Sequence, residues 1–494
     1  MVIHDIFLLS PEISLAILAV FVLGLRLSKF NSRVTTRITL IGFLIPLIFV
    51  ALLWGEVSSD VNLKILLAGG NLTIDYLALF FKMFFLISGF LVILAASGDL
   101  ESKKYEKPEF YPLLIASLIG MMLLPSTNDM ITMYVSLELS TLPMIILAAF
   151  SITPKSSEAA LKFLILSAIS SAILLYGIAL IFGYLGTIDF AILALGIQDA
   201  ITISESKGDI AIIIIGMIML IAGFGFKIAL FPFHTWIPDV YEGAPLPITA
   251  FLSVASKAAG FAILVRILSV SFGALNMDWG MILAILAVAS MTFGNMAAIV
   301  QTNIKRMLAY STIAHAGYAA IGLAVALKGD IGSTVYGLEV LLFYLIAYAL
   351  TNFGAFFAIM AVGGKDSMIE ISDLSGLRHK SPWTAGFMSL SLLSLTGIPP
   401  TIGFMGKLFI FSAAIKAGLT WLAIIGIVNS VVSAYYYFKV IRVIYTDTSE
   451  QVNPIHVATN LKVAMIIATL GILICGLRPD LVLHFAKIAS QNIF

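Results

Sequence analysis

The sequence predicts an all-α protein that crosses a membrane many times. Three observations carry this prediction: a mean hydropathy of +1.07, a share of charged residues of only 11%, and apolar runs that recur along all 494 residues. Soluble domains carry roughly 25% charged residues. Because lipid supplies no hydrogen-bond partners, a spanning backbone must be helical or form a closed barrel, and runs of this length indicate helices.

The spans follow from run length, since a helix needs about 20 predominantly apolar residues to cross a bilayer. The first run has no basic segment before it and contains Glu12, so we expect a retained span and not a cleaved signal peptide. The twelfth run is long enough for two half-helices. The fourteen predicted spans are 8–27, 37–54, 74–96, 109–125, 128–150, 158–185, 210–230, 246–271, 279–300, 304–327, 333–362, 383–417, 420–445 and 459–478.

Lysine and arginine predict the orientation, because loops that carry them stay on the cytoplasmic side. Of the 28 basic residues, sixteen fall in loops and flanks on one side of the predicted spans and seven, including Arg266, on the other. This asymmetry predicts a cell-membrane protein with both termini on the periplasmic or exterior side. The remaining five basic residues lie inside apolar runs: Lys82, Lys162, Lys227, Lys257 and Lys407.

The composition excludes several kinds of site. A formal net charge of +1 gives no basic field for nucleic acid. Cys475 is the only cysteine and the six histidines show no metal-binding spacing, so we expect this chain to hold no metal and no iron–sulfur cluster. No glycine-rich loop follows a soluble strand, which excludes the usual nucleotide sites.

One stretch, GFGFKIALFPFHTWIPDVYEGAP at 223–245, predicts a broken helix beside a charge. The apolar run before it carries Lys227 and then meets Pro232, which removes a backbone donor and clashes with the preceding turn. A break at membrane depth is tolerated where protein or water satisfies the backbone, and an ionisable residue beside it is typical of an ion pathway. The alternative is a loop between two spans, with Lys227 paired structurally to a carboxylate.

Each charge inside a span is unfavourable by roughly 2.5–3.5 kcal/mol on insertion scales, so the five lysines need partners or a function. Glu138, in MYVSLELSTLPMIIL, is the clearest carboxylate within a span, and Lys162 follows in the next span. Neighbouring antiparallel helices predict an ion pair between them. The alternative is a salt bridge that only fixes helix packing.

Two further residues extend the series. Lys257 lies on the span after Lys227, among small residues that permit close helix approach. Desolvation and a neighbouring like charge both favour loss of the proton from an ammonium group, so this pair of lysines predicts proton carriers. His315 lies between Tyr310 and Tyr318, and a neutral imidazole can pass a proton between its two nitrogens. The alternative is a core histidine with satisfied hydrogen bonds.

Lys407 closes the series in SLTGIPPTIGFMGKLFIF, where Gly397, Pro399 and Pro400 mark a second interrupted helix. Two broken spans, one in each half and each with a lysine, are expected of an internally repeated transporter.

Lys82 is the exception, because no break adjoins it in the sequence. We predict a structural role for it, paired with Asp75 or with a partner subunit. The cluster of Tyr435, Tyr436 and Tyr437 predicts an interfacial aromatic belt.

Taken together, these motifs resemble the antiporter-like membrane subunits of respiratory complex I, most closely the subunit N group. HTWIPDVYEGAP at 234–245, YSTIAHAGY at 310–318 and TGIPPTIGFMGK at 396–407 carry the resemblance, which spans nearly the whole chain. It implies two inverted five-helix repeats with helices 7 and 12 discontinuous. The implied divisions are 1–108 for helices 1 to 3, 109–271 for the first repeat, 279–445 for the second, and 446–494 for the C-terminal helix 14.

The resemblance also implies that six residues take part in proton translocation. Opening and closing of an ion pair on the fifth and sixth helices changes the proton affinity of a central lysine in that family. The matching positions are Glu138 for the fifth-helix glutamate, Lys162 for its partner lysine, Lys227 for the central lysine, Lys257 for the connecting lysine, His315 for the tenth-helix histidine, and Lys407 for the terminal lysine of the second half-channel.

The function implied is that of a proton-translocating membrane subunit of an NADH:quinone oxidoreductase. NADH, flavin, iron–sulfur clusters and quinone would belong to partner subunits, with no redox centre in this chain. The implied partners are antiporter-like neighbours, small membrane subunits and the lipid bilayer. Three alternatives stay open: a cation/proton antiporter subunit, the equivalent subunit of an archaeal relative that takes electrons from a reduced deazaflavin or ferredoxin, and a structural spacer with inert charges.

Overall fold

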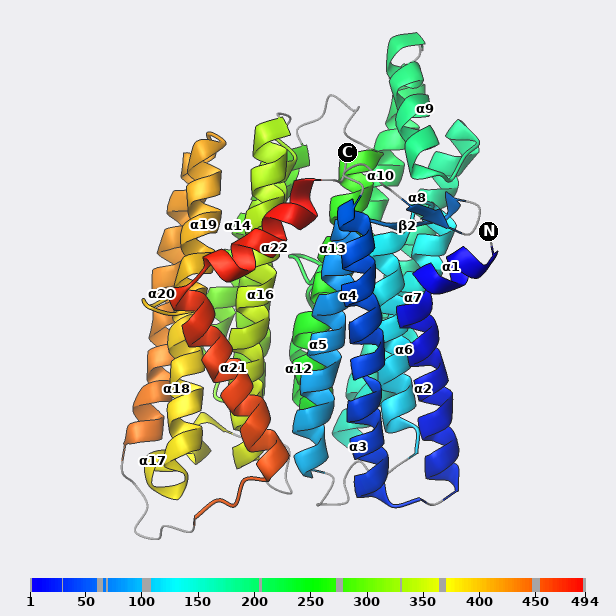
Figure 1. Ribbon diagram of the computed structural model, residues 1–494. Coiled ribbons are helices and arrows are strands. Elements are labelled where there is room, and N and C mark those ends of the chain that lie inside the picture. Colours follow the sequence, from blue (N-terminus) through cyan, green and yellow to red (C-terminus); the bar gives the residue numbers. More distant parts are fainter. Residues whose placement is uncertain are drawn as a thin grey trace.

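The computed structural model describes residues 2–28, 30–59, 65–67, 70–99, 108–203, 207–271, 279–328, 331–363, 370–446 and 454–491. Within these residues the chain is a bundle of long helices that alternate in direction (Figure 1). Lys29, Lys64, Lys103, Lys104, Lys107 and Lys365, which enter the orientation argument, lie outside the described ranges.

The first segment holds four helices, a small hairpin and a fifth helix. The hairpin pairs antiparallel, with Ile65 opposite Ile74, and the sequence analysis did not predict it. The elements are α1 (Val2–Leu8), α2 (Ser10–Leu27), α3 (Ser32–Gly42), α4 (Leu44–Ser59), β1 (Ile65–Leu67), β2 (Leu72–Ile74) and α5 (Tyr76–Asp99).

The next segment contains the first break. Helix α10 ends at Ile228, and a short helix, α11, precedes a span that includes one π-helical turn at Leu252–Ser256. The elements are α6 (Phe110–Leu123), α7 (Met130–Ala148), α8 (Pro154–Leu185), α9 (Phe190–Ile203), α10 (Lys207–Ile228), α11 (Ile237–Gly243), α12 (Leu246–Phe251) and α13 (Lys257–Val270).

The last segment contains the second break, between α18 and α19. It ends in an amphipathic helix, α22, that packs against α16 and α5 and that the sequence analysis did not predict. The elements are α14 (Trp279–Ile299), α15 (Ile304–Ala326), α16 (Ile331–Val362), α17 (Leu377–Lys380), α18 (Pro382–Thr396), α19 (Ile402–Lys416), α20 (Thr420–Tyr445), α21 (Thr459–Leu477) and α22 (Asp480–Gln491).

These helices confirm the predicted fold class. Twelve continuous helical stretches within the described residues are long and apolar enough to cross a membrane. The shorter apolar helix α6 corresponds to the fourth predicted span. Helices α18 and α19 form the predicted pair of half-helices of the twelfth span, which brings the total to fourteen. Boundaries differ by a few residues: the sixth span begins at Pro154, where Thr153 caps α8 by accepting a hydrogen bond from the Ser156 backbone.

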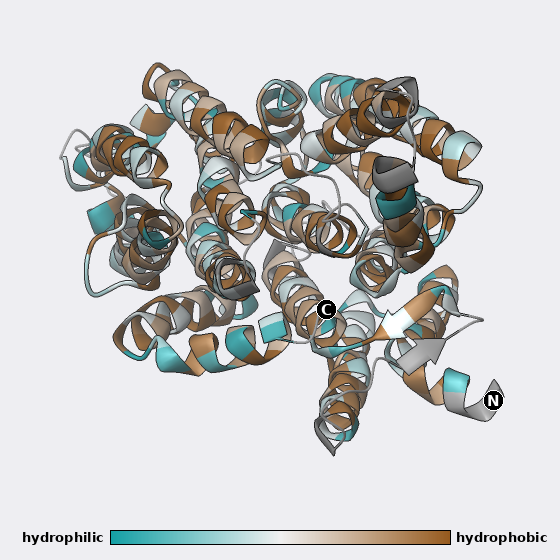
Figure 2. Cartoon of the chain, turned by 90° about the horizontal axis from the view of Figure 1, so that it is seen from above, coloured by the Kyte–Doolittle hydropathy of each residue, from teal (hydrophilic) through white to brown (hydrophobic). Residues whose placement is uncertain are grey.

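The burial pattern separates central from peripheral helices. The stretch 246–268 and helix α15 are almost entirely buried, whereas α8 and α20 leave much of their apolar surface exposed. Seen along the bundle, hydrophobic residues dominate nearly every helix and hydrophilic ones are few (Figure 2). Charged side chains on the two central helices are therefore surrounded by protein, where they need polar partners.

Two buried ion pairs tie the N-terminal helices together and to the rest of the bundle. Lys82 on α5 lies 2.8 Å from the Glu12 carboxylate on α2. Arg266 on α13 donates to both oxygens of Asp75, at 2.9 and 2.7 Å. The predicted pairing of Lys82 with Asp75 is therefore wrong, because Asp75 is bound by a closer cation. Arg266 is a buried side chain and does not belong to an outward loop.

Candidate functional site

The first break forms where α10 meets the proline-containing segment. Helix α10 ends at Ile228, four residues before Pro232, and Ala229 adopts a left-handed conformation with φ of 65°. The backbone amide of Leu230 donates to the Gly225 carbonyl at 2.9 Å, and the indole of Trp236 donates to the Phe226 carbonyl at 3.0 Å. Protein groups thus satisfy the backbone that the break frees, as membrane depth requires.

Lys227 sits in the last turn of α10, and its ammonium group is buried against α7. Its Nζ donates to the hydroxyls of Ser140 at 2.9 Å and Thr141 at 2.7 Å. Beside it is a cavity that Ser171 and Thr141 also line, with about 10 Å³ open to the centre of a water molecule. That volume is close to what one water needs.

Glu138 belongs to this same polar cluster. Its carboxylate accepts a hydrogen bond from the hydroxyl of Ser171, a residue that lines the Lys227 cavity. Glu138 lies on α7 two residues before Ser140, so one stretch of helix supplies both the carboxylate and the partners of Lys227. Ser140, Thr141 and Ser171 were not predicted from the sequence. Ser140 and Thr141 lie within a turn of Glu138 on α7, which was the available signal, whereas Ser171 comes from α8 and had no such signal.

The predicted ion pair between Glu138 and Lys162 is wrong in this structure. Lys162 instead binds Glu158, one turn earlier on α8, and Asp239 on α11, both at 2.8 Å. Ser171, the partner of Glu138, is nine residues beyond Lys162 on the same helix, a separation of about two and a half turns. Lys162 therefore projects from one face of α8, and Glu138 contacts the opposite face of that helix.

Asp239 lies between the candidate spans, half-exposed, and accepts from two cations. Burial raises the pKa of its carboxyl, but the hydrogen bonds from Lys162 and Arg306 outweigh it, so the pKa lies below its ordinary value. Asp239 is thus a carboxylate at neutral pH.

Lys257 begins α13, directly after the π-helical turn. Its ammonium group is buried and donates to the backbone carbonyl of Thr312 on α15 at 2.9 Å. One turn later, Gly260 packs so closely on α10 that an added Cβ would come within 3.1 Å of Cγ of Lys227. The small residue lets the two lysine-bearing helices meet, as the sequence predicted.

His315 on α15 faces the same cavity as Lys257. This cavity has about 10 Å³ open to the centre of a water molecule and is also lined by Tyr344 and Tyr348. Nδ1 of His315 lies 2.7 Å from the Tyr344 hydroxyl, and Nε2 lies 3.2 Å from that of Tyr437. Both ring nitrogens therefore have phenolic partners, an arrangement in which a proton can arrive at one and leave from the other.

Tyr436 and Tyr437 are buried, so the predicted aromatic belt is wrong for both of them. Tyr436 donates to the Asn295 side chain at 3.0 Å, and Tyr437 bonds to Ser311. Of the three consecutive tyrosines only Tyr435 is exposed, at 64%. The helix turns neighbouring residues by about 100°, which separates them between two environments.

Lys407 occupies the second break. Helix α18 ends at Thr396 and is capped by Gly397, whose φ of 92° suits glycine, and the chain restarts in α19 after Pro400. The Lys407 ammonium donates to the carbonyls of Leu395 and Thr396 and to the Ser430 hydroxyl, each at 2.9 Å. It therefore satisfies backbone carbonyls that the interrupted helix frees.

The aromatic ring of Tyr318 contacts both Lys407 and His315. The Lys407 nitrogen lies 4.9 Å from the centre of that ring, and the His315 ring packs edge-on against it with centroids 5.6 Å apart. Four predicted residues, Lys227, Lys257, His315 and Lys407, thus follow one another through the centre of the bundle. Within the described residues no cluster of three potential metal ligands occurs.

The chain is similar to known membrane proteins over most of its length. The NADH:quinone oxidoreductase/Mrp antiporter transmembrane family matches residues 127–433. NADH-quinone oxidoreductase subunit N of Desulforamulus reducens is 39% identical over 488 residues, covering 98% of each chain. A chain of respiratory complex I from Thermus thermophilus superposes with a TM-score of 0.78 at 31% identity, covering 96% of this chain and 98% of the other.

A second solved structure shares the fold alone. A chain of the membrane-bound sulfane sulfur reductase, an archaeal respiratory membrane complex, superposes with a TM-score of 0.84 at 24% identity, covering 99% of this chain and 98% of the other. The match to the family pattern and the identity over nearly the full length agree. The chain belongs to the NADH:quinone oxidoreductase/Mrp antiporter family of membrane proteins, with subunit N of NADH-quinone oxidoreductase among its relatives.

Proposed function

We propose that this chain is a proton-translocating membrane subunit of an NADH:quinone oxidoreductase complex. The observation that carries the proposal is the series of buried cations and one imidazole, Lys227, Lys257, His315 and Lys407, which runs through the bundle centre with polar partners at each position. Buried ammonium groups exchange protons more readily than exposed ones, because desolvation disfavours their charged form.

In the proposed route, protons enter at the cytoplasmic end near the first break and reside on Lys227. Glu138 and its Ser171 partner share that site, so a change in the carboxylate's environment alters how tightly Lys227 holds its proton. The proton then passes to Lys257, to His315 with its two tyrosine partners, and to Lys407. Both termini lie on the exterior side in this proposal. The implied repeats at 109–271 and 279–445 each contain one break.

Electron transfer is assigned to partner subunits, where NADH, flavin, iron–sulfur clusters and quinone bind. An iron–sulfur cluster needs four protein ligands, usually cysteines, and this chain has one cysteine. A conformational or electrostatic change in the partner subunits would drive proton transfer along this route. Moving one charge against the membrane potential requires about 2.3 kcal/mol per 100 mV, and breaking one or two buried hydrogen bonds is of that size.

Reconstituted complex in vesicles tests the proposal. Proton uptake and electron transfer are measured together for wild type, Lys227→Ala and Glu138→Ala. We expect fewer protons per electron in both variants. An unchanged ratio in both would support an inert spacer, and transport that requires sodium would support a cation/proton antiporter.

A further inference from the structure

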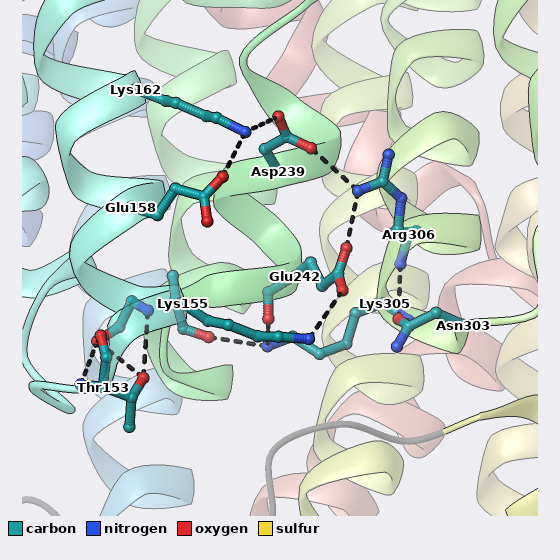
Figure 3. A network of polar contacts seen from close by, with 11 residues as sticks. Thr153, Lys155, Glu158, Lys162, Asp239, Glu242, Asn303, Lys305 and Arg306 are labelled. Atoms are coloured by element: carbon teal, nitrogen blue, oxygen red, sulfur yellow. Dashed lines mark hydrogen bonds and ion pairs between the residues drawn. The ribbon is translucent and has the colours of Figure 1, made fainter.

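A charged network surrounds the short helix α11, between the first break and the next span. We call Lys162, Asp239, Glu242 and Arg306 the α11 clamp (Figure 3). None of the steps in the proton route above uses Asp239, Glu242 or Arg306. The clamp joins α8 and α11, which precede the middle of the chain, to α15, which follows it.

The two carboxylates of α11 are each shared between elements. Asp239 accepts from Lys162 of α8 through one oxygen at 2.8 Å and from Arg306 of α15 through the other at 3.0 Å. Glu242 accepts from the same Arg306 nitrogen at 2.7 Å, and its other oxygen lies 3.8 Å from Lys155 of α8. One nitrogen of Arg306 thus bridges both acids.

The first turn of α15 is an unfavourable position for cations, because the helix dipole is positive there. Asn303 caps this helix by accepting from the amides of Lys305 and Arg306, which fixes both cations in that turn. Lys305 donates to the carbonyls of Glu242 and Ala244, at 2.6 and 2.8 Å, at the end of α11. The carboxylates and carbonyl groups of α11 offset the unfavourable interaction of these cations with the α15 dipole. These contacts therefore stabilise the packing of α11 against the first turn of α15.

Helix α11 is in turn connected to Lys227. Trp236, the residue before α11, donates its indole N–H to the carbonyl of Phe226, next to Lys227. The same indole stacks on Phe163, next to Lys162, with centroids 4.6 Å apart and planes 2° from parallel. A displacement of α11 therefore moves the end of α10, and with it the Lys227 ammonium.

At the other end, α15 carries Arg306, His315 and the Thr312 carbonyl that accepts from Lys257. A continuous helix transmits a shift along its axis, so a change around His315 or Lys257 reaches Arg306. The clamp contributes little to the free energy of folding, because the side chains of Lys162, Asp239 and Arg306 are 43%, 34% and 31% exposed and exposed ion pairs stabilise weakly.

We propose that Arg306 is a positioning residue for proton transfer at Lys227. By holding Asp239 and Glu242, it couples the position of α15, and so the state of Lys257 and His315, to the position of the Lys227 ammonium across the first break. This inference rests on the proposed proton-translocating function, because it concerns how two steps of that route are coordinated.

The test uses the intact complex in vesicles and compares Arg306→Gln with Arg306→Lys. Protons translocated per electron and electron transfer per assembled complex are measured separately. We expect the ratio to fall in Arg306→Gln toward the value of Lys227→Ala. Arg306→Lys should recover part of the lost proton-to-electron ratio. A lysine ammonium group has three donors, and in the wild type a single nitrogen of Arg306 makes the bonds to both Asp239 and Glu242.

Arg442→Gln is the matched control, since Arg442 is an exposed arginine in the last turn of α20 and touches none of the clamp. It should leave the ratio unchanged. A merely structural role of Arg306 would reduce the amount of assembled complex and lower both rates in proportion, with the ratio constant. That result would overturn the inference.

The comparison with Lys227→Ala separates the two ideas. If Lys227→Ala lowers the ratio and Arg306→Gln does not, the clamp is not a positioning device and the proposed function stands. If neither variant changes the ratio, the proposed function fails together with the inference. Combining Asp239→Asn with Arg306→Gln should lower the ratio no further than Arg306→Gln alone, because Arg306→Gln already removes the ion pair through which Asp239 links α11 to α15.

Discussion

Lys257 and His315 come from different helices and line one cavity, with the Lys257 ammonium bound to the carbonyl one turn before the histidine. The cavity leaves room for about one water between them. Transfer between the two groups therefore needs a short movement or a single water. The Tyr344 hydroxyl at 2.7 Å from Nδ1 gives that nitrogen of His315 a hydrogen-bond partner that can either donate or accept a proton.

Tyr344→Phe removes that hydroxyl and keeps the ring. A buried ring nitrogen without a partner is unfavourable by about 1–3 kcal/mol, so proton translocation should slow by about tenfold to a hundredfold while the complex assembles normally. The measurement is the rate of vesicle acidification at matched electron transfer. Tyr336→Phe, on the same helix but packed under Lys416, is the control, and equal effects of the two changes would refute the role of Tyr344.

Thr141→Val removes one of the two hydroxyl partners of Lys227 with little change in shape. A hydrogen bond to a charged group contributes about 1.5–3 kcal/mol, so Lys227 should hold its proton at least about tenfold less tightly. Half-maximal translocation should then move to lower pH, as read from a pH profile of the reconstituted complex. Ser136→Ala, one turn before Ser140 on α7, serves as control. A pH profile that matches wild type would contradict the prediction.

Lys162 is predicted to act with Asp239 and independently of Glu138. Glu138→Gln and Lys162→Met should have additive effects on the thermal stability of the purified complex, within about 0.5 kcal/mol, because they share no partner. Lys162→Met and Asp239→Asn should be non-additive by about 0.2–1 kcal/mol, the range for partly exposed ion pairs. Strong coupling between Glu138 and Lys162 would restore the pair that the sequence predicted.

The sequence predicted the spans and the breaks well because both depend on local features. Run length sets the fourteen spans, and Pro232 and the Pro399–Pro400 pair interrupt helices wherever they occur. The buried lysines were also identifiable, since a charge within an apolar run has few other interpretations.

Partner identity was not predictable, because it depends on helix rotation and on contacts distant in the sequence. Lys162 and Glu138 lie on adjacent helices, yet α8 turns Lys162 toward Asp239, 77 residues away. Lys82 similarly binds Glu12 and not Asp75. The buried tyrosines around His315 come from α16 and α20, and nothing in their local sequence distinguishes Tyr437 from the exposed Tyr435.

Lys82 and Glu12 are predicted to be purely structural. Lys82→Met alone leaves a buried carboxylate without a partner and should destabilise by about 3–5 kcal/mol, whereas Lys82→Met with Glu12→Leu should be nearly neutral. Yield and thermal inactivation of the purified complex measure this difference. Protons per electron should match wild type in the double variant, and a lower ratio there would give this pair a part in transport.

Lys227, Lys257 and Lys407 are proposed to act in one continuous route. The most direct measurement is the number of protons translocated per electron in the reconstituted complex, for each Lys→Ala variant and for the triple variant. Residues that act in series are strongly non-additive, so the triple variant should lose no more than the most affected single variant. Losses that add from one lysine to the next would show separate routes and contradict the account.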